Sequence, residues 1–326
     1  MELKKKLKNI TSRFKNKNVL VVGDLILDHH IFGSVERVSP EAPVPVVWAN
    51  KEKFACGGAA NVGLNLSSLG AKVSLCGVIG RDHFGKTLFS LMNEGGICTD
   101  LVVKDNTRPT TLKTRIIANH QQVVRVDWES LEFLSANTNR LVLNKIKKNL
   151  DNFDAVIVED YGKGAINPLL LEELISVCRE RKKIITVDPK EEHFDYYENV
   201  TALTPNLKEA QSVVNTKIRN KSQLPFLGKI IMKKLNLKAL LITLGEDGMM
   251  LFSGKEYHHI PTAALEVFDV SGAGDTVISV FTLSLASGSS YKEAAMIANL
   301  AAGVVVGKLG AATVAKKELN KVIDEK

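Results

Sequence analysis

The sequence predicts an α/β fold in which helices cover both faces of a doubly wound, mostly parallel sheet, with a small β-sheet lid. Three observations predict it. The chain has 326 residues, 45% of them hydrophobic and 24% charged, which is enough to bury one large core. From about residue 155 onward, short apolar strands alternate with helical segments. Two extended stretches, at about 31–50 and 108–128, interrupt the pattern. We therefore expect one domain over residues 1–326 with these stretches as lid insertions.

The composition argues against several classes of protein. The four cysteines show no CxxC pairs and no metal-ligand spacing, which predicts reduced thiols in the cytoplasm. No apolar region follows the basic N-terminal segment, which we expect to form an amphipathic helix, and later apolar runs are too short to span a bilayer. The net charge of +7 is spread along the chain, which favours phosphorylated metabolites over nucleic acid as partners.

The first predicted strand, residues 18–22, ends at Gly23 and is followed by two carboxylates, Asp24 and Asp28. Open α/β sheets bind ligands at the carboxyl ends of their strands, and carboxylates there suit sugar hydroxyls. A plain turn-capping role is the alternative for Asp24. Residues 56–61, with the sequence CGGAAN, then open a helix that ends at Gly70. Gly57 and Gly58 permit close approach of a ligand to the backbone, and Asn61 can hydrogen-bond to it.

The two extended stretches are predicted to form one lid over the sugar site. Residues 33–48 contain three prolines, which predict an edge strand or an exposed flap. Residues 110–117 and 122–128 alternate like a β-hairpin joined through Asn119 and His120. Lys113 and Arg115 share one face of its first arm. Solvated hairpin faces are the alternative interpretation of these charges.

Residues 80–87, GRDHFGKT, match the P-loop pattern GxxxxGK[ST] between a strand-like segment at 73–79 and a predicted helix. This predicts a rival function, a P-loop NTPase, with the strand at 155–160 as its acidic magnesium-holding partner. Asp82, His83 and Phe84 count against it, because a phosphate cradle needs small residues.

The second half of the chain alternates regularly. Strands are predicted at 155–158, 183–187, 202–203 and 239–243, and helices at 168–181, 208–214 and 223–235. Residues that follow the strands share the ligand-binding edge of the sheet. Glu209 can face magnesium and phosphates or close a helix capping box with Asn206, and the 243–248 turn can bind a nucleotide or simply form a hairpin. The strand-end candidates are Lys163, Asp188, Lys190, Asn206, Glu209, Thr243, Gly245 and Gly248.

Residues 268–276, FDVSGAGDT, open a further helix and form the strongest candidate site. Gly272, Ala273 and Gly274 allow a tight turn that points amide N–H groups at one spot, an anion hole for a phosphoryl group. Asp275, in the first helical turn, is placed to accept a proton from an attacking hydroxyl. A glycine-rich turn capped by this aspartate is the alternative. In the predicted helix at 291–308, Asn299 and Gly303 can pack against a flat base, although helix packing explains small residues equally well.

Taken together, GDLILD, CGGAAN, TPNLKE, TLGEDG and DVSGAGDT, in this order, resemble the PfkB/ribokinase family of sugar kinases over essentially the whole chain. The resemblance implies a Rossmann-like fold with a β lid and ATP-dependent phosphorylation of a sugar hydroxyl with Asp275 as base. It also implies that Asp28, Gly57, Gly58 and Asn61 hold the sugar, that Asn206 and Glu209 serve phosphate and Mg²⁺, and that Thr243, Gly245 and Asn299 line the nucleotide site. The P-loop match then becomes coincidental, because the family has a GxDxxG turn there.

Within the family, RVSPEAPVPVV, EDYGKG, DPK and AAGVVVGKLG look like the heptose kinases of lipopolysaccharide precursor synthesis. The resemblance implies phosphorylation of D-glycero-β-D-manno-heptose 7-phosphate at O1. A substrate that already carries a phosphate needs a second cationic site, for which the candidates are Arg37, Lys113, Arg115 and Lys163. Bifunctional members add a nucleotidyltransferase domain with an HxGH motif that this sequence lacks, so we expect another protein to perform adenylyl transfer.

Further expectations accompany this resemblance: Asp269 as a candidate site for a monovalent cation such as K⁺, and a homodimer formed through the lid. Ser271 stands where many relatives have threonine, and the hydroxyl is retained. Two alternatives stay open, a kinase of another sugar or nucleoside and a catalytically idle sugar-binding module. An intact base and anion hole disfavour the second.

Overall fold

The computed structural model describes residues 2–119, 121–214, 220–264 and 266–325. At its centre lies an eight-stranded sheet with the order β14-β13-β12-β11-β10-β9-β1-β4. All neighbours from β4 to β12 are parallel, and β13 and β14 extend the sheet as antiparallel strands. The predicted α/β class and parallel sheet are confirmed. The strands are β1 (Asn18–Gly23), β4 (Lys72–Cys76), β9 (Ala155–Glu159), β10 (Ile184–Asp188), β11 (Ala202–Leu203), β12 (Ala239–Thr243), β13 (Met249–Ser253) and β14 (Glu256–Ile260).

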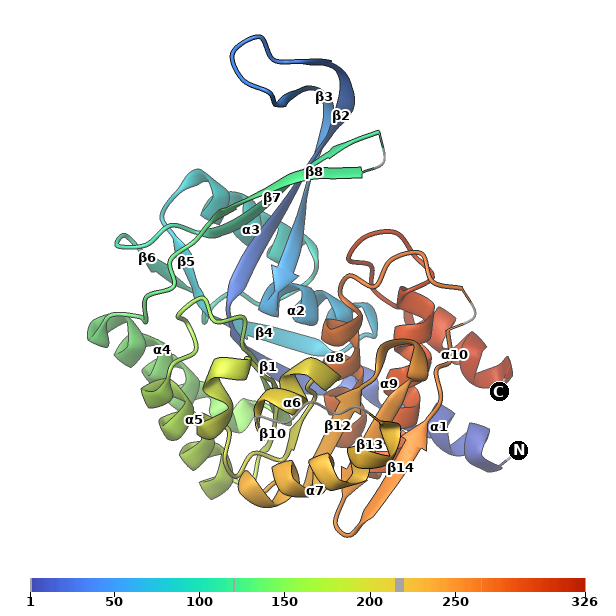
Figure 1. The fold of residues 1–326 in the computed structure, drawn as a ribbon. Helices are drawn as coiled ribbons and strands as arrows, with labels where there is room; N and C mark the ends of the chain where they lie inside the picture. Colours follow the sequence, from blue (N-terminus) through green and yellow to red (C-terminus); the bar gives the residue numbers. More distant parts are fainter. Residues whose placement is uncertain (1, 120, 215–219, 265, 326) are drawn as a thin grey trace.

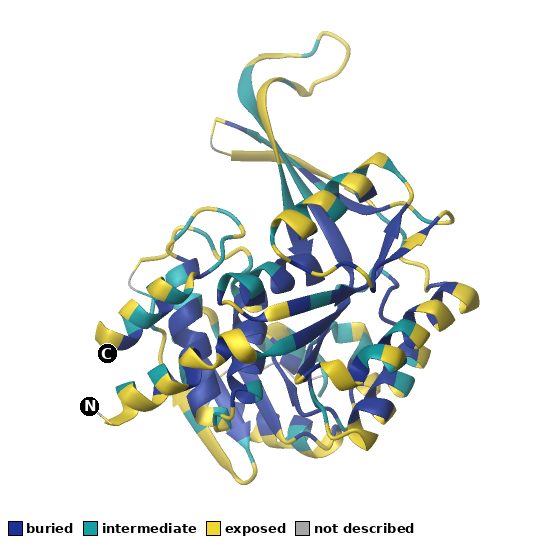
Figure 2. Ribbon diagram, turned by 180° about the vertical axis from the view of Figure 1, so that it is seen from behind, coloured by how far each residue is buried: buried dark blue, intermediate teal, exposed yellow. Residues whose placement is uncertain are grey.

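Helices cover both faces of this sheet and enclose a core on each side. Alternate side chains of β1 show why, since Val19 and Val21 join one cluster of buried residues and Leu20 and Val22 the other. Figure 2 shows the buried sheet between helices whose outer faces are exposed. One layer contains α1 (Glu2–Ser12), α2 (Ala59–Ser68), α8 (Ala273–Ala286), α9 (Tyr291–Val305) and α10 (Lys316–Glu325), and the other contains α4 (Ala136–Asn149), α5 (Pro168–Glu180), α6 (Leu207–Ser212) and α7 (Leu224–Lys234).

Most predicted helices are present, with shifted ends. The helix expected at 291–308 stops at Val305, and α2 begins directly after the paired glycines. The basic N-terminal segment forms the expected amphipathic helix, α1, whose Leu7 and Ile10 are buried. No helix in the described part of the chain combines the length and the apolarity needed to cross a membrane.

A second sheet projects from the body as the lid (Figure 1). Its order is β3-β2-β7-β8, and α3 (His83–Glu94) packs near its base. β2 pairs with β7 only as far as Gly33, so the rest of β2 and its partner β3 protrude as a two-stranded hairpin with the prolines around its tip. The expected flap and hairpin are therefore present; His120, expected at the turn of the hairpin, lies outside the described residues. The strands are β2 (Leu25–Val38), β3 (Pro45–Gly58), β7 (Thr111–Ala118) and β8 (Gln121–Trp128).

The prediction of one continuous strand at 73–79 is wrong. The chain divides at Gly77 into β4, in the central sheet, and β5 (Val78–Gly80), which pairs with β6 (Val103–Asp105) in a separate two-stranded sheet. A Cβ atom at Gly77 would lie 2.5 Å from the carbonyl oxygen of Gly23, so only glycine allows the chain to pass there. The division removes the segment before Gly80 from the sheet edge that a P-loop needs.

Candidate active site

Asp275 lies in the first turn of α8, and its carboxylate is fixed by two donors. The Asn61 side chain donates from Nδ2 to Oδ2 at 2.5 Å, and the Tyr161 hydroxyl donates to Oδ1 at 3.1 Å. The residue is 5% exposed. Burial raises the pKa of Asp275, and the two hydrogen bonds counteract this effect. A buried carboxylate with a raised pKa, held in one orientation, is suited to accept a proton.

The turn before Asp275 has the conformation expected for an anion-binding helix terminus. Gly272 adopts the left-handed conformation, with φ 76° and ψ 7°, and caps α8. The N–H of Gly274 has no acceptor among the residues that the structure describes, whereas that of Ala273 donates to the Val270 carbonyl at 3.2 Å. The expected anion hole thus keeps Gly274 as a free donor, and Ala273 is already engaged.

The lid brings a second carboxylate toward Asp275. Asp28, on β2, accepts a hydrogen bond from Arg115 on β7 at 2.5 Å, and its negative charge contributes to the raised pKa of Asp275. Gly57 faces Asp28 so closely that a Cβ atom would lie 2.5 Å from Oδ2. Gly58, with φ 54°, caps α2, which carries Asn61. The residues expected to hold the sugar, apart from Asp24, therefore meet beside Asp275.

Asp24 does not join them. Its carboxylate accepts backbone N–H groups of Tyr161, Lys163 and Ala165 at 2.9, 3.1 and 3.1 Å, and the residue is 2% exposed. Burial and the charge of Asp160 raise the pKa of Asp24 to about 6. The expectation that Asp24 contacts the sugar is therefore wrong. Its role is structural, because its hydrogen bonds connect the loop after β9 to the end of β1.

A cluster of carboxylates continues from Asp275 along the strand ends. Oxygen atoms of Glu159, Asp188 and Asp275 lie within 4.8 Å of one another. Both oxygens of Glu159 are buried with no hydrogen-bond partner among the described residues, while Asp188 accepts from the Thr204 hydroxyl at 2.8 Å. Burial, followed by the charge of Asp188, raises the pKa of Glu159 well above its ordinary value. Oxygen-only anionic donors of this kind fit a divalent cation.

The two turns expected to face the nucleotide lie side by side. Asn206 and Thr243 form an isolated parallel bridge, and the Thr243 N–H donates to the Pro205 carbonyl at 2.9 Å. Asn206 and Glu209 form the capping box of α6, with bonds of 3.0 and 2.8 Å. Lys190 extends its aliphatic stem along Gly162, and its charge acts on Glu209. Gly245 and Gly248 both have positive φ in the second turn.

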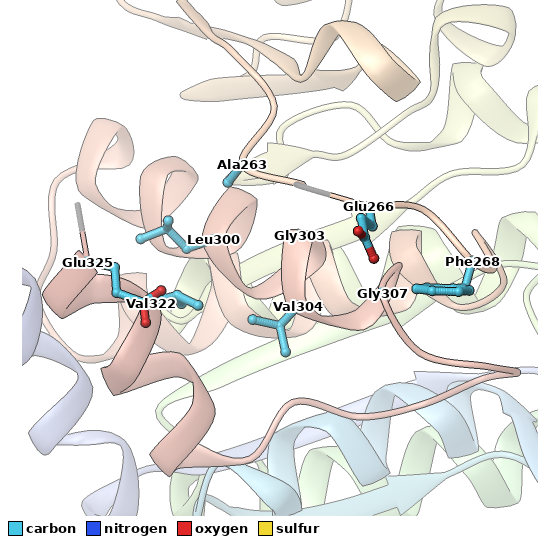
Figure 3. A pocket seen from close by; sticks show the side chains of 9 residues that line it. All are labelled: Ala263, Glu266, Phe268, Leu300, Gly303, Val304, Gly307, Val322 and Glu325. Atoms are coloured by element: carbon cyan, nitrogen blue, oxygen red, sulfur yellow. The ribbon is translucent and has the colours of Figure 1, made fainter.

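Asn299 and Gly303 shape a cleft from the side of α9. Asn299 donates to the Pro261 carbonyl at 2.8 Å and so holds the segment at 261–263 against the helix. A Cβ atom at Gly303 would lie 3.0 Å from the backbone of Ala263, so the glycine lets this segment pack closely. Beside them opens a cleft of about 580 Å³ with mostly apolar walls (Figure 3). It is lined by Ala263, Glu266, Phe268, Leu300, Gly303, Val304, Gly307, Val322 and Glu325.

Asp269 fixes the segment between this cleft and α8. Its oxygens accept the N–H groups of Ser271 at 2.9 Å and Gly310 at 3.0 Å. Burial acts to raise the pKa of Asp269, but hydrogen bonds led by that of Ser271 outweigh it, and the pKa is lowered. The carboxylate of Asp269 is ionised and lies beside an irregular loop. The monovalent-cation site expected there stays a prediction.

The four cationic candidates for a substrate phosphate separate into two groups. Lys113 and Lys163 lie close enough for the charge of Lys163 to lower the pKa of Lys113, which burial lowers most. Lys163 also pairs with Glu129 at 2.7 Å. Arg115 is occupied by Asp28, and Arg37 is exposed near the end of β2, nine residues beyond Asp28, or about 30 Å along an extended strand. Arg37 therefore lies too far from Asp28 to contact a substrate bound beside it, and the expectation that Arg37 binds the substrate phosphate within the same chain is wrong.

The P-loop alternative is wrong. Asp82, in the middle of the GRDHFGKT segment, caps α3 and accepts the N–H groups of Gly85 at 2.6 Å and Thr110 at 2.8 Å. A carboxylate therefore occupies the position where a P-loop would hold phosphate. Lys86 is exposed to solvent.

We expect Lys86→Ala to change kcat, the KM for the nucleotide and the KM for the acceptor by less than about twofold each. Surface substitutions away from a site have small effects. A P-loop enzyme would instead lose most of its activity. Steady-state ADP release measures the difference, and a hundredfold loss would restore the P-loop interpretation.

With this geometry established, the class of protein follows from comparison with known families. A family model described as pfkB family carbohydrate kinase matches residues 16–318. The chain belongs to this family. Solved structures share the fold: Arabidopsis thaliana ribokinase complexed with ribose and ATP (TM-score 0.74, 20% identity, 94% of this chain and 98% of that one), and phosphofructokinase-2 from Escherichia coli in complex with potassium (TM-score 0.78, 17% identity, 95% and 98%).

Among curated proteins, the chain is similar to relatives named Bifunctional protein HldE. It is 43% identical to that of Pelobacter propionicus over 317 residues, and 42% identical to that of Geobacter sulfurreducens over 316 residues. These alignments cover 97% and 96% of this chain but 65% and 64% of the relatives. The chain thus spans less than two thirds of their length.

Two residues at the centre of the site were not assigned to the kinase site from the sequence, although Glu159 lies in the strand at 155–160 that the P-loop alternative gave to magnesium. Tyr161 contacts Asp275 directly, and Glu159 lies in the carboxylate cluster. Both stand at the carboxyl end of β9, in the same EDYGKG segment that contains Lys163. Their position at a strand end was a usable signal, but tyrosine in a turn has no distinctive pattern of its own.

Proposed function

We propose that this protein transfers the γ-phosphoryl group of ATP to O1 of D-glycero-β-D-manno-heptose 7-phosphate and releases the 1,7-bisphosphate. The observation that carries the proposal is the buried Asp275 carboxylate, oriented by two donors in the first turn of α8. The HldE relatives and the sequence features shared with heptose kinases support the choice of sugar. Because ATP and sugar phosphates are cytoplasmic metabolites, we place the proposed reaction in the cytoplasm.

In the proposed reaction the sugar lies between Asp275 and the base of the lid. Asp275 accepts the proton of the attacking O1 hydroxyl as the new O–P bond forms and the bond to the β-phosphate of ADP breaks. The Gly274 N–H and the dipole of α8 stabilise the charge that spreads over the transferred group. Asp28 and the buried Oδ1 of Asn61, which has no hydrogen-bond partner among the described residues, are available to accept hydrogen bonds from sugar hydroxyls.

The carboxylate cluster fits the divalent ion that phosphoryl transfer uses. Glu159 and Asp188 would hold Mg²⁺, with Glu209 acting through water, and the ion would neutralise phosphate charge. Lys190 and Asn206 lie at the same edge and are placed to contact the phosphates of the nucleotide. Asp269 remains our candidate for binding K⁺.

We assign the nucleotide to the opposite side of Asp275 from the lid. The apolar cleft beside Gly303 has the size and lining of a small-ligand site and suits a flat base. Thr243, Gly245 and Gly248 supply a polar turn near it. Asn299 contributes indirectly, because it holds the segment that forms one wall of the cleft.

The phosphate already present on the sugar is assigned to Lys113 and Lys163. Both lie beside Tyr161, the former with its ammonium 5.2 Å from the ring centre. Two ammonium groups on one side of the sugar site match the charge of a phosphomonoester. A sugar without the terminal phosphate would leave Lys113 without an ion-pair partner among the described residues, whereas Lys163 would keep its pair with Glu129.

The test is a panel of acceptors. Purified protein with ATP and Mg²⁺ is offered the heptose 7-phosphate, sugar 6- and 5-phosphates and free sugars, and ADP release is followed. We expect the highest kcat/KM with the heptose 7-phosphate and a phosphorus NMR signal for an anomeric phosphate. Preference for a free sugar or a nucleoside would instead assign another kinase activity, and no turnover would favour a binding module.

We also propose a homodimer in which the lid of one copy packs on that of another. β8 is an exposed edge strand, and Val124, Val126 and Trp128 on one face are 44%, 41% and 63% exposed. Edge strands with apolar faces pair readily with another chain.

If the lids pair in this way, Val124→Asp combined with Val126→Asp should convert a dimer to a monomer in sedimentation velocity at about 10 μM, because two buried charges oppose the contact. Phe226→Asp, which alters an exposed residue of α7, should leave the dimer intact. A wild-type monomer at that concentration would overturn the proposal.

A further inference from the structure

The carboxylate of Asp275 accepts hydrogen bonds from two elements that are distant from each other in the sequence. Asn61 comes from α2, after the lid strand β3, and Tyr161 comes from the loop after β9. One donor binds each carboxylate oxygen. The Tyr161 hydroxyl makes no other hydrogen bond with the part of the chain that the structure describes. Within the described ranges, the bond to Asp275 is therefore the whole of the hydroxyl's hydrogen bonding.

The backbone that carries Tyr161 is tightly fixed. Asp24 accepts the N–H of Tyr161 itself, and also those of Lys163 and Ala165. Gly162 and Gly164 have φ values of 65° and 82°, and a Cβ atom at Gly164 would lie 1.9 Å from the carbonyl oxygen of Glu132. Such a loop has few alternative conformations. The loop thus fixes the Cα–Cβ bond of Tyr161, and the hydrogen bond to Asp275 holds the rest of the side chain.

The ring of Tyr161 is held as firmly as its backbone. The ammonium of Lys113, from β7 of the lid, lies 5.2 Å from the ring centre, within the range of a cation–π contact. A phenol has an ordinary pKa of about 10 and is protonated at neutral pH. The phenol consequently keeps its proton and remains a hydrogen-bond donor.

Asp275 needs such a donor because of its neighbours. Oxygens of Glu159 and Asp188 lie within 4.8 Å of its own, and like charges at this distance repel one another in a buried environment. With a single donor, the carboxylate could rotate about its Cβ–Cγ bond. With donors on both oxygens its orientation is defined, and each oxygen keeps a second lone pair for a proton.

We infer that Tyr161 is a positioning residue for the phosphoryl transfer, which sets the orientation of Asp275 toward the sugar hydroxyl. The inference rests on the proposed function. In the reaction the hydroxyl proton of the sugar moves to Asp275, and Tyr161 keeps its own proton throughout. Its contribution is preorganisation: the carboxylate meets the hydroxyl in a reactive geometry without first having to turn.

Another tyrosine provides a matched comparison. The Tyr197 hydroxyl is buried and, like that of Tyr161, donates to a carboxylate, that of Asp160, at 2.7 Å. It accepts the Lys190 N–H at 3.0 Å and so connects two loops without contacting Asp275. Removing the Tyr161 hydroxyl deletes one hydrogen bond and removing the Tyr197 hydroxyl deletes two, but only the Tyr161 bond involves the base.

The experiment compares Tyr161→Phe with Tyr197→Phe in the full chain, using the best acceptor found for the wild type. For Tyr161→Phe we expect kcat to fall roughly 10- to 50-fold, less than the 10²-fold that a 1 Å misplacement can cost, with KM for ATP and sugar changed by less than about threefold. Tyr197→Phe should lower the unfolding temperature at least as much as Tyr161→Phe does. It should leave kcat within about twofold of the wild-type value.

Replacing Tyr161 with 3-fluorotyrosine keeps both the ring and the hydroxyl and should retain at least about a third of kcat, so the difference between this variant and Tyr161→Phe measures the effect of the hydroxyl alone. This variant also keeps the test decisive if Tyr161→Phe folds poorly. Unchanged kcat in Tyr161→Phe, an effect on KM alone, or equal losses in both phenylalanine variants would overturn the inference and leave the kinase assignment intact. A wild type that phosphorylates no acceptor would overturn both.

Discussion

Asp275→Asn should lower kcat by about 10³-fold, since general-base catalysis contributes roughly 10² to 10⁴. The amide has nearly the same shape as the carboxylate, so the first turn of α8 should keep its conformation. Its NH₂ group cannot accept a proton and would face one of the two donors, Asn61 or Tyr161. The dissociation constant of the nucleotide, measured by calorimetry, should change by less than about threefold, because uniform binding of ATP does not depend on this group.

Asp100→Asn is the matched control for this change. Asp100 is exposed near the start of β4, at the opposite edge of the sheet from the strand-end turns. Its substitution should leave kcat unaltered. If Asp275→Asn retained more than about a tenth of the wild-type kcat, the assignment of the base would be wrong, because no general base contributes so little.

Lys113→Met should raise KM for the phosphorylated sugar by about 10- to 100-fold, the effect of losing about 1.5–3 kcal/mol from a charged hydrogen bond. Lys113 is partly buried, forms no ion pair with the described residues and lies beside Lys163, so its ammonium is available to a phosphate. Methionine keeps roughly the length of the side chain but lacks the ammonium, so it also removes the cation–π contact with the Tyr161 ring. KM for ATP should stay the same.

The chain offers a close control in Lys104, whose ammonium lies 4.1 Å from the ring centre of Phe89, away from the site. Lys104→Met removes the same kind of cation–π contact and should leave both KM values unchanged. Equal effects of the two substitutions, or a higher KM for ATP only, would exclude Lys113 from a sugar phosphate site. Free sugars, if they are turned over, should be insensitive to Lys113→Met.

The central sheet was predictable because its strands are short apolar runs that end in turns rich in glycine, proline and asparagine. Alternation from residue 155 onward placed Asp188, Asn206 and Thr243 at one edge, where the structure has them. The break at Gly77 was not predictable, since residues 73–79 read as one apolar run. The contact that excludes a side chain there, with the Gly23 carbonyl, comes from a strand 54 residues earlier in the sequence.

The site was predicted less completely than the fold. Strand-end position alone cannot distinguish Asp28, which faces Asp275, from Asp24, which turns inward to three backbone amides. Arg37 was selected by charge, but the length of the lid hairpin takes it away from the site. Tyr161 was overlooked because its importance depends on a single contact across 114 residues of sequence.

The lid and the body carry different parts of the site (Figure 1). Asp28, Lys113 and Arg115 belong to the lid sheet, whereas Asp275, Glu159 and Asp188 belong to the body. For evolution, this means that the acceptor can change through substitutions in β2 and β7 while the machinery for ATP is inherited intact. We expect that exchanging lid residues between relatives would alter the preferred sugar and preserve nucleotide use, so substrate range in this family can diversify without rebuilding the reaction.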